Sequence, residues 1–373
     1  MKKLIAIAMM AALICTSTFA APKKKAKKAA KKSSVKIAMV TDSGDITDQS
    51  FNQTTYQACK DYAEANGLEF QYYKPAGDST ADRVASIDAA YQDGYNVIVL
   101  PGYLFGEAIV KVAKDYSDAK FVGLDISEGD LGGQAVPANV FCAVYQEELP
   151  GFFAGYAAVK EGFRHLGFLG GMAVPAVIRY GYGFVQGTNK AAEELGVAGD
   201  VTVEYVYGGQ FYGDQTITAS MDGWYKNRGV EVVFACGGGI WTSACEAAAK
   251  VGGKVIGVDV DQTAQINSFA KDMHVTSAMK GLAATVNSAL SAIQAGKWDE
   301  YSGKVATLGL VSGTDSSANY VGLPTDTWTM KNFTVKEYKK LVSDVFEKKV
   351  AVSNDIENAP ATSVKVNYYQ NIK

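Results

Sequence analysis

The chain has 373 residues, of which 48% are hydrophobic and 20% are charged, and its formal net charge is −3. These values are typical of a globular protein of about two domains. Residues 1–32 hold nine Lys and no acidic residue; removing these nine from the 36 basic residues leaves 27 against 39 acidic ones, a charge of −12. That charge argues against nucleic acid as a partner. The only two His, His165 and His274, exclude a His-rich metal site and disfavour a His-based catalytic triad.

Residues 1–20 have the pattern of a secretory signal peptide. Two Lys precede the apolar run Leu4–Leu13, and a small residue, Ala20, ends the segment before the expected cleavage point. A membrane anchor is the alternative, but this run is short for a bilayer span. Cys15 could carry a lipid, although Ile14 rather than a small residue precedes it. We expect an exported protein, periplasmic or at the cell surface, with a lipid anchor as the alternative.

Residues 21–34 include the run KKKAKKAAKKSS. Its like charges repel and it has no apolar face, so we expect a solvated tether that could stay near anionic lipid through charge alone. Beyond it, four cysteines show no metal-ligand spacing and permit three disulfide pairings. Cys59, Cys142 and Cys236 lie in apolar patterns, which favours buried thiols.

From Val35 onward, short apolar runs alternate with stretches of helical spacing. The predicted strands are Val35–Asp42, Asn96–Gly102, Phe121–Asp125, Leu166–Gly171, Glu231–Gly238 and Lys254–Asp261. The predicted helices are Ser50–Asn66, Ser79–Asp93, Glu107–Tyr116, Leu149–Lys160, Gly183–Leu195, Thr242–Lys250 and Gly281–Ala295. This alternation predicts parallel sheets with helices on both faces.

The series restarts near His165, which indicates two similar lobes with a cleft between them. The predicted fold class is therefore α/β, with two doubly wound parallel-sheet lobes. Open parallel sheets bind ligands at the carboxyl ends of their strands. We expect the binding site around Asp42, Asp125, residues 237–239 and Asp259.

The first strand end, within VTDSGDITDQSFNQ, combines a carboxylate with an aromatic ring. Asp42 ends the strand, the chain turns at Gly44, and Asp48 or Ser50 can cap the following helix. Phe51 lies in the first helical turn, where its ring could stack on a flat ligand. Packing of Phe51 into the core is the alternative.

Two later strand ends carry charges. In GVDVDQ, Asp259 and Asp261 lie two residues apart on an extended segment and share a face. Carboxylates accept hydrogen bonds from hydroxyl pairs, as on a ribose or hexose, but helix capping or an ion pair explains them equally well. Lys280 ends VTSAMK and could pair with Asp259 or bind ligand oxygens.

The run Gly237-Gly238-Gly239 allows the backbone to approach a ligand and to donate N–H groups. No GxxxxGK[ST] loop, no GxGxxG motif in the first βα turn and no GxSxG elbow is present. The chain therefore lacks the usual parts for nucleotide hydrolysis, dinucleotide redox chemistry and serine hydrolysis. We expect a protein that is not an enzyme and uses no cofactor or metal.

Seven segments occur in a diagnostic order: TDSGDITDQSFNQ, FVGLDIS, LPGFFAGYAA, GFLGGMAVPAVIRYGYGFVQG, VVFACGGG, VIGVDVDQ and VTSAMK. Through them, residues 35–313 resemble the basic membrane protein family of bacterial ABC-transporter substrate-binding proteins, also called purine nucleoside receptors. The resemblance implies a type I periplasmic-binding-protein fold whose lobes close about a hinge. It also implies a monomeric receptor that captures a nucleoside, with purines favoured, and delivers it to an ABC permease in the membrane.

The resemblance implies roles for individual residues around the base. Phe51 of SFNQ would stack on the purine ring, and Asn52 of the same motif would contact the ligand. Asp42 and Asp125 would accept hydrogen bonds from the base edge or fix neighbouring groups.

Other carried-over roles concern the ribose and a second ring. Asp259 and Lys280 would hold ribose hydroxyls, and Gly238 would provide backbone contacts. Tyr180 stands where the family usually has Phe, so we assign it as the second stacking ring, with Phe184 as the alternative.

The chain departs from the family pattern after its three glycines, where Trp241 could narrow the pocket or stack on the ligand. This leaves a sugar or autoinducer receptor open, since Asp259 and Trp241 suit a sugar ring. A third hypothesis is an exported enzyme such as a nucleoside hydrolase, which would use Asp42, Asp48, Asp259 and Asp261.

In a type I fold the chain crosses between the lobes several times. The predicted domains are a signal peptide at 1–20, a tether at 21–34, lobe one at 35–145 plus 264–300, lobe two at 146–263 plus 301–330, and a C-terminal extension at 331–373.

Overall fold

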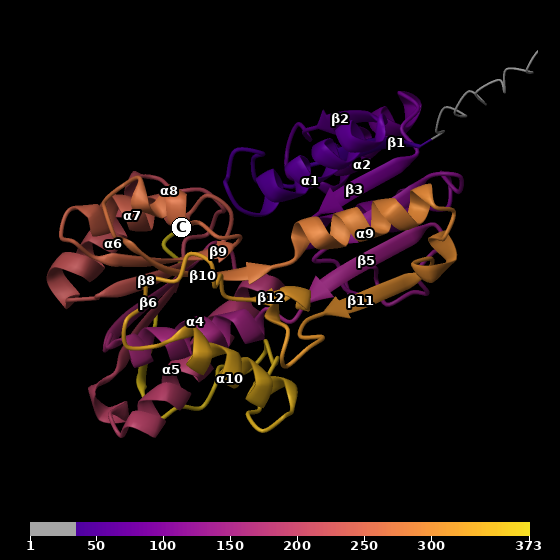
Figure 1. Ribbon diagram of the computed structural model, residues 1–373. Coiled ribbons are helices and arrows are strands. Elements are labelled where there is room, and N and C mark those ends of the chain that lie inside the picture. Colours follow the sequence, from indigo (N-terminus) through magenta and orange to yellow (C-terminus); the bar gives the residue numbers. More distant parts are fainter. Residues whose placement is uncertain (1–34) are drawn as a thin grey trace, which may run out of the picture. The chain divides into compact units, whose positions relative to one another are not determined.

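The computed structural model describes residues 35–373, in which strands alternate with helices (Figure 1). The strands are β1 (Lys36–Val40), β2 (Glu69–Tyr73), β3 (Val97–Pro101), β4 (Lys120–Leu124), β5 (Val140–Tyr145), β6 (His165–Gly170), β7 (Thr202–Tyr207), β8 (Val232–Cys236), β9 (Lys254–Asp259), β10 (His274–Lys280), β11 (Lys304–Leu308), β12 (Val321–Gly322) and β13 (Lys365–Tyr368). The α-helices are α1 (Phe51–Asn66), α2 (Thr80–Gln92), α3 (Gly106–Val112), α4 (Glu148–Glu161), α5 (Pro175–Leu195), α6 (Gln215–Asp222), α7 (Trp241–Ala249), α8 (Thr263–Asn267), α9 (Leu282–Gln294) and α10 (Val335–Phe346). The predicted signal peptide with Cys15 and the predicted tether lie outside the described residues.

The strands form two sheets. The first has the order β11-β5-β4-β3-β1-β2 and is parallel throughout. The second has the order β12-β10-β9-β8-β6-β7-β13 and is parallel except for the short β12, which runs antiparallel to β10. We call each sheet, together with the helices that cover it, a lobe. The predicted α/β class with parallel sheets is confirmed.

Both faces of each sheet are buried, which explains why the central strands read as continuous apolar runs. In β1, Ile37 and Met39 share a core with α1 and α9, whereas Ala38 and Val40 share one with α2 and α3. In the second sheet, α4 and α5 cover one face, and α6 and α7 cover the other.

The strand pairing differs from the predicted domain boundaries in three segments. Strand β10, in the segment 264–300 assigned to lobe one, pairs with β9 in the second sheet, while α9 of the same segment packs against α1 beside the first sheet (Figure 1). Strand β11, in the segment 301–330 assigned to lobe two, pairs with β5 in the first sheet. Strand β13, in the predicted extension, pairs with β7. Parallel strands pair across long connections, so periodicity along the chain does not encode their partners.

Helices α4 and α5 touch through glycines spaced four residues apart. A Cβ on Gly151 or Gly155 of α4, or on Gly183 or Gly187 of α5, would overlap a carbonyl oxygen of the other helix. Residues four apart lie on one helix face, so these glycines form a continuous contact. The predicted helix starts at Gly183, whereas α5 starts at Pro175, a residue that suits the first helical turn.

The four cysteines of the described residues, Cys59, Cys142, Cys236 and Cys245, are free and buried. Burial raises the pKa of each thiol, so none is an activated nucleophile. Over residues 35–373, no helix has both the length and the apolar character needed to cross a membrane.

Candidate ligand-binding site

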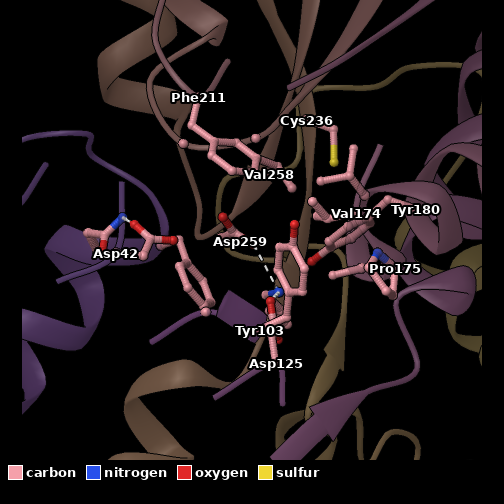
Figure 2. A pocket seen from close by; sticks show the side chains of 18 of the residues that line it. Asp42, Tyr103, Asp125, Val174, Pro175, Tyr180, Phe211, Cys236, Val258 and Asp259 are labelled. Carbon is pink, nitrogen blue, oxygen red and sulfur yellow. Dashed lines mark hydrogen bonds and ion pairs between the residues drawn. The ribbon is translucent and has the colours of Figure 1, made fainter. Parts of the chain in front are cut away.

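A cavity lies where the carboxyl ends of strands from both sheets meet, as parallel sheets predict. The first lobe lines it with Asp42 after β1, Phe51 and Asn52 at the start of α1, Gly102, Tyr103 and Leu104 after β3, and Asp125 after β4. The second lobe contributes Val174, Pro175, Ala176, Val177 and Tyr180 of or next to α5, Phe211 after β7, Cys236, Gly237 and Gly238 at the end of β8, Val258 and Asp259 of β9, and Lys280 of β10. Figure 2 shows the labelled side chains of both lobes directed at a common space.

Most of the predicted contacts therefore lie together on the cavity wall. They are Asp42, Phe51, Asn52, Asp125, Tyr180, Gly238, Asp259 and Lys280. Phe184 is not among them, because it is fully buried in the second lobe, with its ring centroid 5.4 Å from that of Phe234. Trp241 is not among them either, because its indole Nε1 turns to the Asp48 carbonyl oxygen, at 3.0 Å. Asp48 and Asp261, two carboxylates of the hydrolase hypothesis, also lie outside the cavity wall.

Lys280 is the centre of a buried charge cluster that joins the lobes. Its Nζ donates to Asp125 Oδ2 at 2.6 Å and to Glu147 Oε1 at 3.4 Å, and it lies 3.8 Å from Asp259 Oδ1. Arg179 Nε supplies a second cation by donating to Glu147 Oε2 at 2.6 Å. Three carboxylates therefore face two cations in a region shielded from water.

Burial shifts the proton affinity of these groups. It raises the pKa of Asp125 to about 7 and also raises the pKa of Asp259, in both cases against the opposing effect of Lys280. Burial acts to lower the pKa of Lys280, but its neighbouring carboxylates outweigh that effect and raise the pKa above the ordinary value. Lys280 therefore stays an ammonium ion. In the described part of the chain, no group of three or more His, Cys, Asp or Glu side chains is arranged to hold a metal ion.

The strand-end carboxylates are held by an uncommon backbone conformation. Asp125 has a φ of 57° and Asp259 a φ of 66°, in the left-handed region that Asp tolerates better than most residues. Such backbone strain clusters at ligand sites, where the surrounding fold must maintain it. Each turn brings its carboxylate to the cavity wall (Figure 2).

Gly238 lies on the cavity wall, as predicted, and its lack of a side chain also permits a close approach within the protein. With its φ of 52°, a Cβ would come within 2.7 Å of the Phe211 carbonyl oxygen. The close approach that the glycine permits is therefore made by the loop that carries Phe211. This loop brings an aromatic ring to the second-lobe side of the cavity (Figure 2).

Three residues of the cavity wall each contain a buried polar atom that has no hydrogen-bond partner within residues 35–373: Asn52 (Oδ1), Asp125 (Oδ1) and Tyr180 (the hydroxyl). Leaving such an atom unpaired costs roughly 1–3 kcal/mol. Aromatic rings lie beside them, since Lys280 Nζ is 4.8 Å from the Phe51 ring centroid and 5.7 Å from that of Tyr180. The cavity therefore suits a ligand with a flat or apolar face and N–H or O–H donors.

Sequence reasoning missed several residues of this site. Tyr103 directly follows a predicted strand end, so the strand-end argument could have found it. Phe211 follows β7, which was not predicted although the alternation of polar and apolar residues in TVEYVY is typical of a strand. Glu147 and Arg179 stand behind the cavity wall, and no sequence pattern relates them to Lys280.

Residues 48–50, which we call the latch segment, bond directly to the second lobe. Trp241 Nε1 donates to the Asp48 carbonyl oxygen at 3.0 Å, and Gln262 Nε2 donates to the Gln49 carbonyl oxygen at 2.9 Å. Ser50 Oγ donates to Asp259 Oδ2 at 2.5 Å. These bonds hold the two lobes together beside the cavity.

Comparison with known proteins gives consistent matches. The profile for ABC transporter substrate-binding proteins of the PnrA-like type matches residues 35–359. The ABC transporter nucleoside-binding protein BmpA of Lactococcus lactis is 30% identical over 247 residues, which are 62% of this chain and 65% of that protein. Basic membrane protein B of Borreliella burgdorferi is 27% identical over 255 residues, covering 66% of this chain and 70% of that protein.

The fold also matches solved structures. A solute-binding protein of an ABC transporter system from Aeropyrum pernix superimposes with a TM-score of 0.66 at 22% identity, covering 86% of this chain and 88% of that one. A second such protein, from Conexibacter woesei, has a TM-score of 0.65, also at 22% identity, and covers 86% of this chain and 99% of that one. At this identity the likeness establishes the fold, which is that of a type I periplasmic binding protein.

Proposed function

Because the chain belongs to the PnrA-like family of ABC transporter substrate-binding proteins, we propose that it captures a nucleoside, preferentially a purine nucleoside, in the cavity between its lobes. The family comprises binding proteins and not enzymes, which removes the hydrolase alternative. We further propose that the protein acts as a monomer and delivers its ligand to an ABC permease. Proteins of this class work outside the cytoplasm or at the cell surface; the signal peptide and a lipid on Cys15 remain predictions.

One observation supports a nucleoside as the ligand. The cavity combines aromatic rings with unpartnered polar atoms in a buried setting, and a nucleoside supplies both a flat base and several N–H and O–H donors. The relative from Lactococcus lactis bears the name of a nucleoside-binding protein, which supports the same class. In this proposal Phe51 stacks on the base, with Tyr180 as the second ring.

Phe51 provides the first test. Titration calorimetry with adenosine, guanosine, inosine and uridine should give saturable binding to the unaltered protein. Replacing Phe51 with Ala should weaken that binding by roughly 1–3 kcal/mol, the usual value of one base-on-aromatic stack. Phe346, 43% exposed at the end of α10, offers a control whose replacement by Ala should not change the affinity. Absence of binding by every nucleoside would refute the proposed ligand, and unchanged affinity of the Phe51 variant would remove Phe51 from the site.

The latch segment gives a second expected result. Replacing Trp241 with Phe removes the bond to Asp48 but keeps a ring for the edge contact with Phe269, whose centroid is 5.8 Å away. One lost hydrogen bond is worth roughly 0.5–1.5 kcal/mol, so nucleoside affinity should fall by up to about tenfold through faster dissociation.

A matched control exists for that result. Trp298 Nε1 donates to the Ala138 carbonyl oxygen at 2.9 Å within the first lobe. Trp298→Phe should therefore leave the dissociation rate unchanged, because it removes a comparable bond that does not join the lobes. Equal effects of the two substitutions would contradict the role given to the latch segment.

A sugar remains the second candidate, because the unpartnered oxygens of Asn52 and Asp125 also accept bonds from sugar hydroxyls. The aromatic partner expected for a sugar ring, Trp241, lies outside the cavity wall, which weakens this candidate. Tighter binding of a hexose than of any nucleoside in the same titration would favour it.

A further inference from the structure

The ring of Phe211 packs on glycine backbone at one side of the cavity. A Cβ on Gly171 would come within 2.6 Å of Phe211 Cδ1, and a Cβ on Gly237 within 3.2 Å of the same atom. Both glycines directly follow strands of the second sheet, β6 and β8. Because neither has a side chain, the ring can lie on the strand ends while it lines the cavity (Figure 2). The position of the ring then depends on residues 208–214, which we call the Phe211 loop.

One side of the Phe211 loop is bonded to the segment that follows β8. The Gly239 backbone N–H donates to the Phe211 carbonyl oxygen at 2.8 Å. Ser243 Oγ donates to the Asp214 carbonyl oxygen at 3.0 Å. These bonds hold the middle and the end of the loop, but neither involves Gln210, the residue before Phe211.

The other side of the loop meets the C-terminal segment, residues 369–373, whose end is marked C in Figure 1. The Ile372 backbone N–H donates to the Tyr207 carbonyl oxygen at 2.9 Å. A Cβ on Gly209, whose φ is 86°, would come within 2.7 Å of the Lys373 carbonyl oxygen. The backbone of the C-terminal segment therefore touches the start of the Phe211 loop.

The side chain of Lys373 joins the two ends of this loop. Its Nζ donates to Gln210 Oε1 at 3.0 Å and also bonds to Asp214 Oδ2. Gln210 Nε2 in turn donates to Asp214 Oδ2 at 3.0 Å and to the Tyr212 carbonyl oxygen at 2.9 Å. The residues on either side of Phe211 are therefore tied into one network, with Lys373 as its cation.

Asp214 gives the network a fixed base. Its Oδ1 caps α6 by accepting from the backbone N–H groups of Thr216 and Ile217, at 2.9 and 3.0 Å. Its Oδ2 is left for Gln210 and Lys373. The bond from Lys373 is the main cause that lowers the pKa of Asp214 to about 2, so Asp214 is a carboxylate at neutral pH.

We propose that Lys373 is a positioning residue, which holds the Phe211 ring at the cavity wall by joining Gln210 to Asp214. The inference rests on the proposed function, because it concerns a wall of the same cavity. Lys373 is not itself among the residues that line the cavity. A ring that is held in place before binding does not have to be ordered when the ligand arrives, so the affinity is higher. Loss of this hold should appear mainly as faster dissociation.

Substitution of Lys373 by Met tests the proposal. Titration calorimetry with adenosine, guanosine, inosine and uridine identifies the nucleoside that the unaltered protein binds most tightly. Lys373→Met should lower the affinity for that nucleoside about 2–5-fold, the range expected from losing an exposed ion pair. Lys340→Met is the control, because Lys340 pairs with Asp344 at 2.6 Å on α10, and no residue of α10 lines the cavity. Its affinity should not change.

A double-mutant cycle separates positioning of the ring from a general structural role. Phe211→Ala removes the ring, so adding Lys373→Met to that variant should cause no further loss of affinity. A contribution to overall stability alone would lower the affinity by the same factor whether or not the ring is present.

A second measurement needs no ligand. The Gly239 amide hydrogen is bonded to the Phe211 carbonyl oxygen, so its exchange with solvent reports opening of the loop. This exchange, followed by NMR, should be about 2–5-fold faster in Lys373→Met and unchanged in Lys340→Met.

The outcomes separate this inference from the proposed function. Unchanged affinity of Lys373→Met, or equal losses with and without the Phe211 ring, would overturn the inference and leave the proposed function intact. Absence of binding by every nucleoside would refute the proposed function. Exchange of the Gly239 amide then decides whether Lys373 holds the loop: a faster rate in Lys373→Met would support that role, and an unchanged rate would overturn it.

Discussion

Replacement of Lys280 by Met is expected to lower the free energy of unfolding by about 3–5 kcal/mol, the usual cost of leaving buried charges unpaired. The Lys280 side chain is 2% exposed and faces the carboxylates of Asp125, Glu147 and Asp259. Met has a similar length and no charge, so the loss measures the missing cation rather than a cavity. Arg179 cannot replace it, because its guanidinium pairs with Glu147 on the other side. Denaturant unfolding of the ligand-free protein at pH 8 gives the measurement.

The loss in free energy of unfolding caused by Lys280→Met should be smaller at lower pH. In the folded protein the pKa of Asp125 is about 7 against an ordinary value of 3.8, so the folded state holds that proton more tightly than the unfolded state. Such a group favours folding at low pH, and the contribution is lost as the pH rises from about 4 through the folded pKa. Without the Lys280 ammonium, the pKa values of Asp125 and Asp259 rise further, because Lys280 acts to lower both. At pH 5 more of these groups are protonated in the variant. Its free energy of unfolding should therefore lie closer to that of the unaltered protein at pH 5 than at pH 8.

Lys297 supplies the control for this experiment. It is 65% exposed and lies 3.9 Å from Glu300 in a surface pair. Lys297→Met should change the free energy of unfolding by less than about 0.5 kcal/mol at either pH. A loss below about 1 kcal/mol for Lys280→Met at pH 8, or one that does not depend on pH, would contradict the role assigned to the buried cluster.

The same cluster shows where sequence reasoning reaches its limit. Asp259 and Lys280 each end a strand and Asp125 directly follows one, so the rule for parallel sheets predicts from the sequence alone that they lie at the cavity. Glu147 follows β5 at the point where the chain passes to the second lobe, and Arg179 lies within α5. Their contact with Lys280 depends on how α4 and α5 pack, which no local pattern encodes.

The strands also differ in how well the sequence predicts them. The strand β3, VIVLP, is fully buried, and its continuous apolar run identifies it from the sequence. The edge strand β2, EFQYY, has exposed Glu69 and Gln71, and its mixed composition does not stand out from a loop. Trp241 illustrates the same limit for side chains. The sequence shows that Trp241 follows the glycine run. The direction of its indole, toward Asp48, depends on how the two lobes pack and could not be predicted.

Replacement of Gly187 by Val is expected to lower the free energy of unfolding by about 3 kcal/mol or more, since overfilling a closely packed contact is costly. A Cβ at Gly187 would overlap the Phe152 carbonyl oxygen of α4, and this neighbour is backbone, which cannot rotate away. Valine adds two further methyl groups to that overlap. Helices α4 and α5 would have to separate, which also disturbs Phe152 and the buried residues around it.

Gly223 provides the control for the Gly187 substitution. It also lies in a helical segment with a negative φ, but a Cβ there meets no atom within 4 Å. Gly223→Val should therefore change the free energy of unfolding by less than about 1 kcal/mol, the range of helix propensities from Gly to a β-branched residue. The difference between the two variants isolates the contact between α4 and α5 from the backbone effect of losing a glycine. Equal stabilities would mean that the two helices do not touch through their backbones. Since α5 begins at the cavity wall with Pro175 and carries Tyr180, the Gly187 variant should also bind nucleosides more weakly than the Gly223 variant when both are folded.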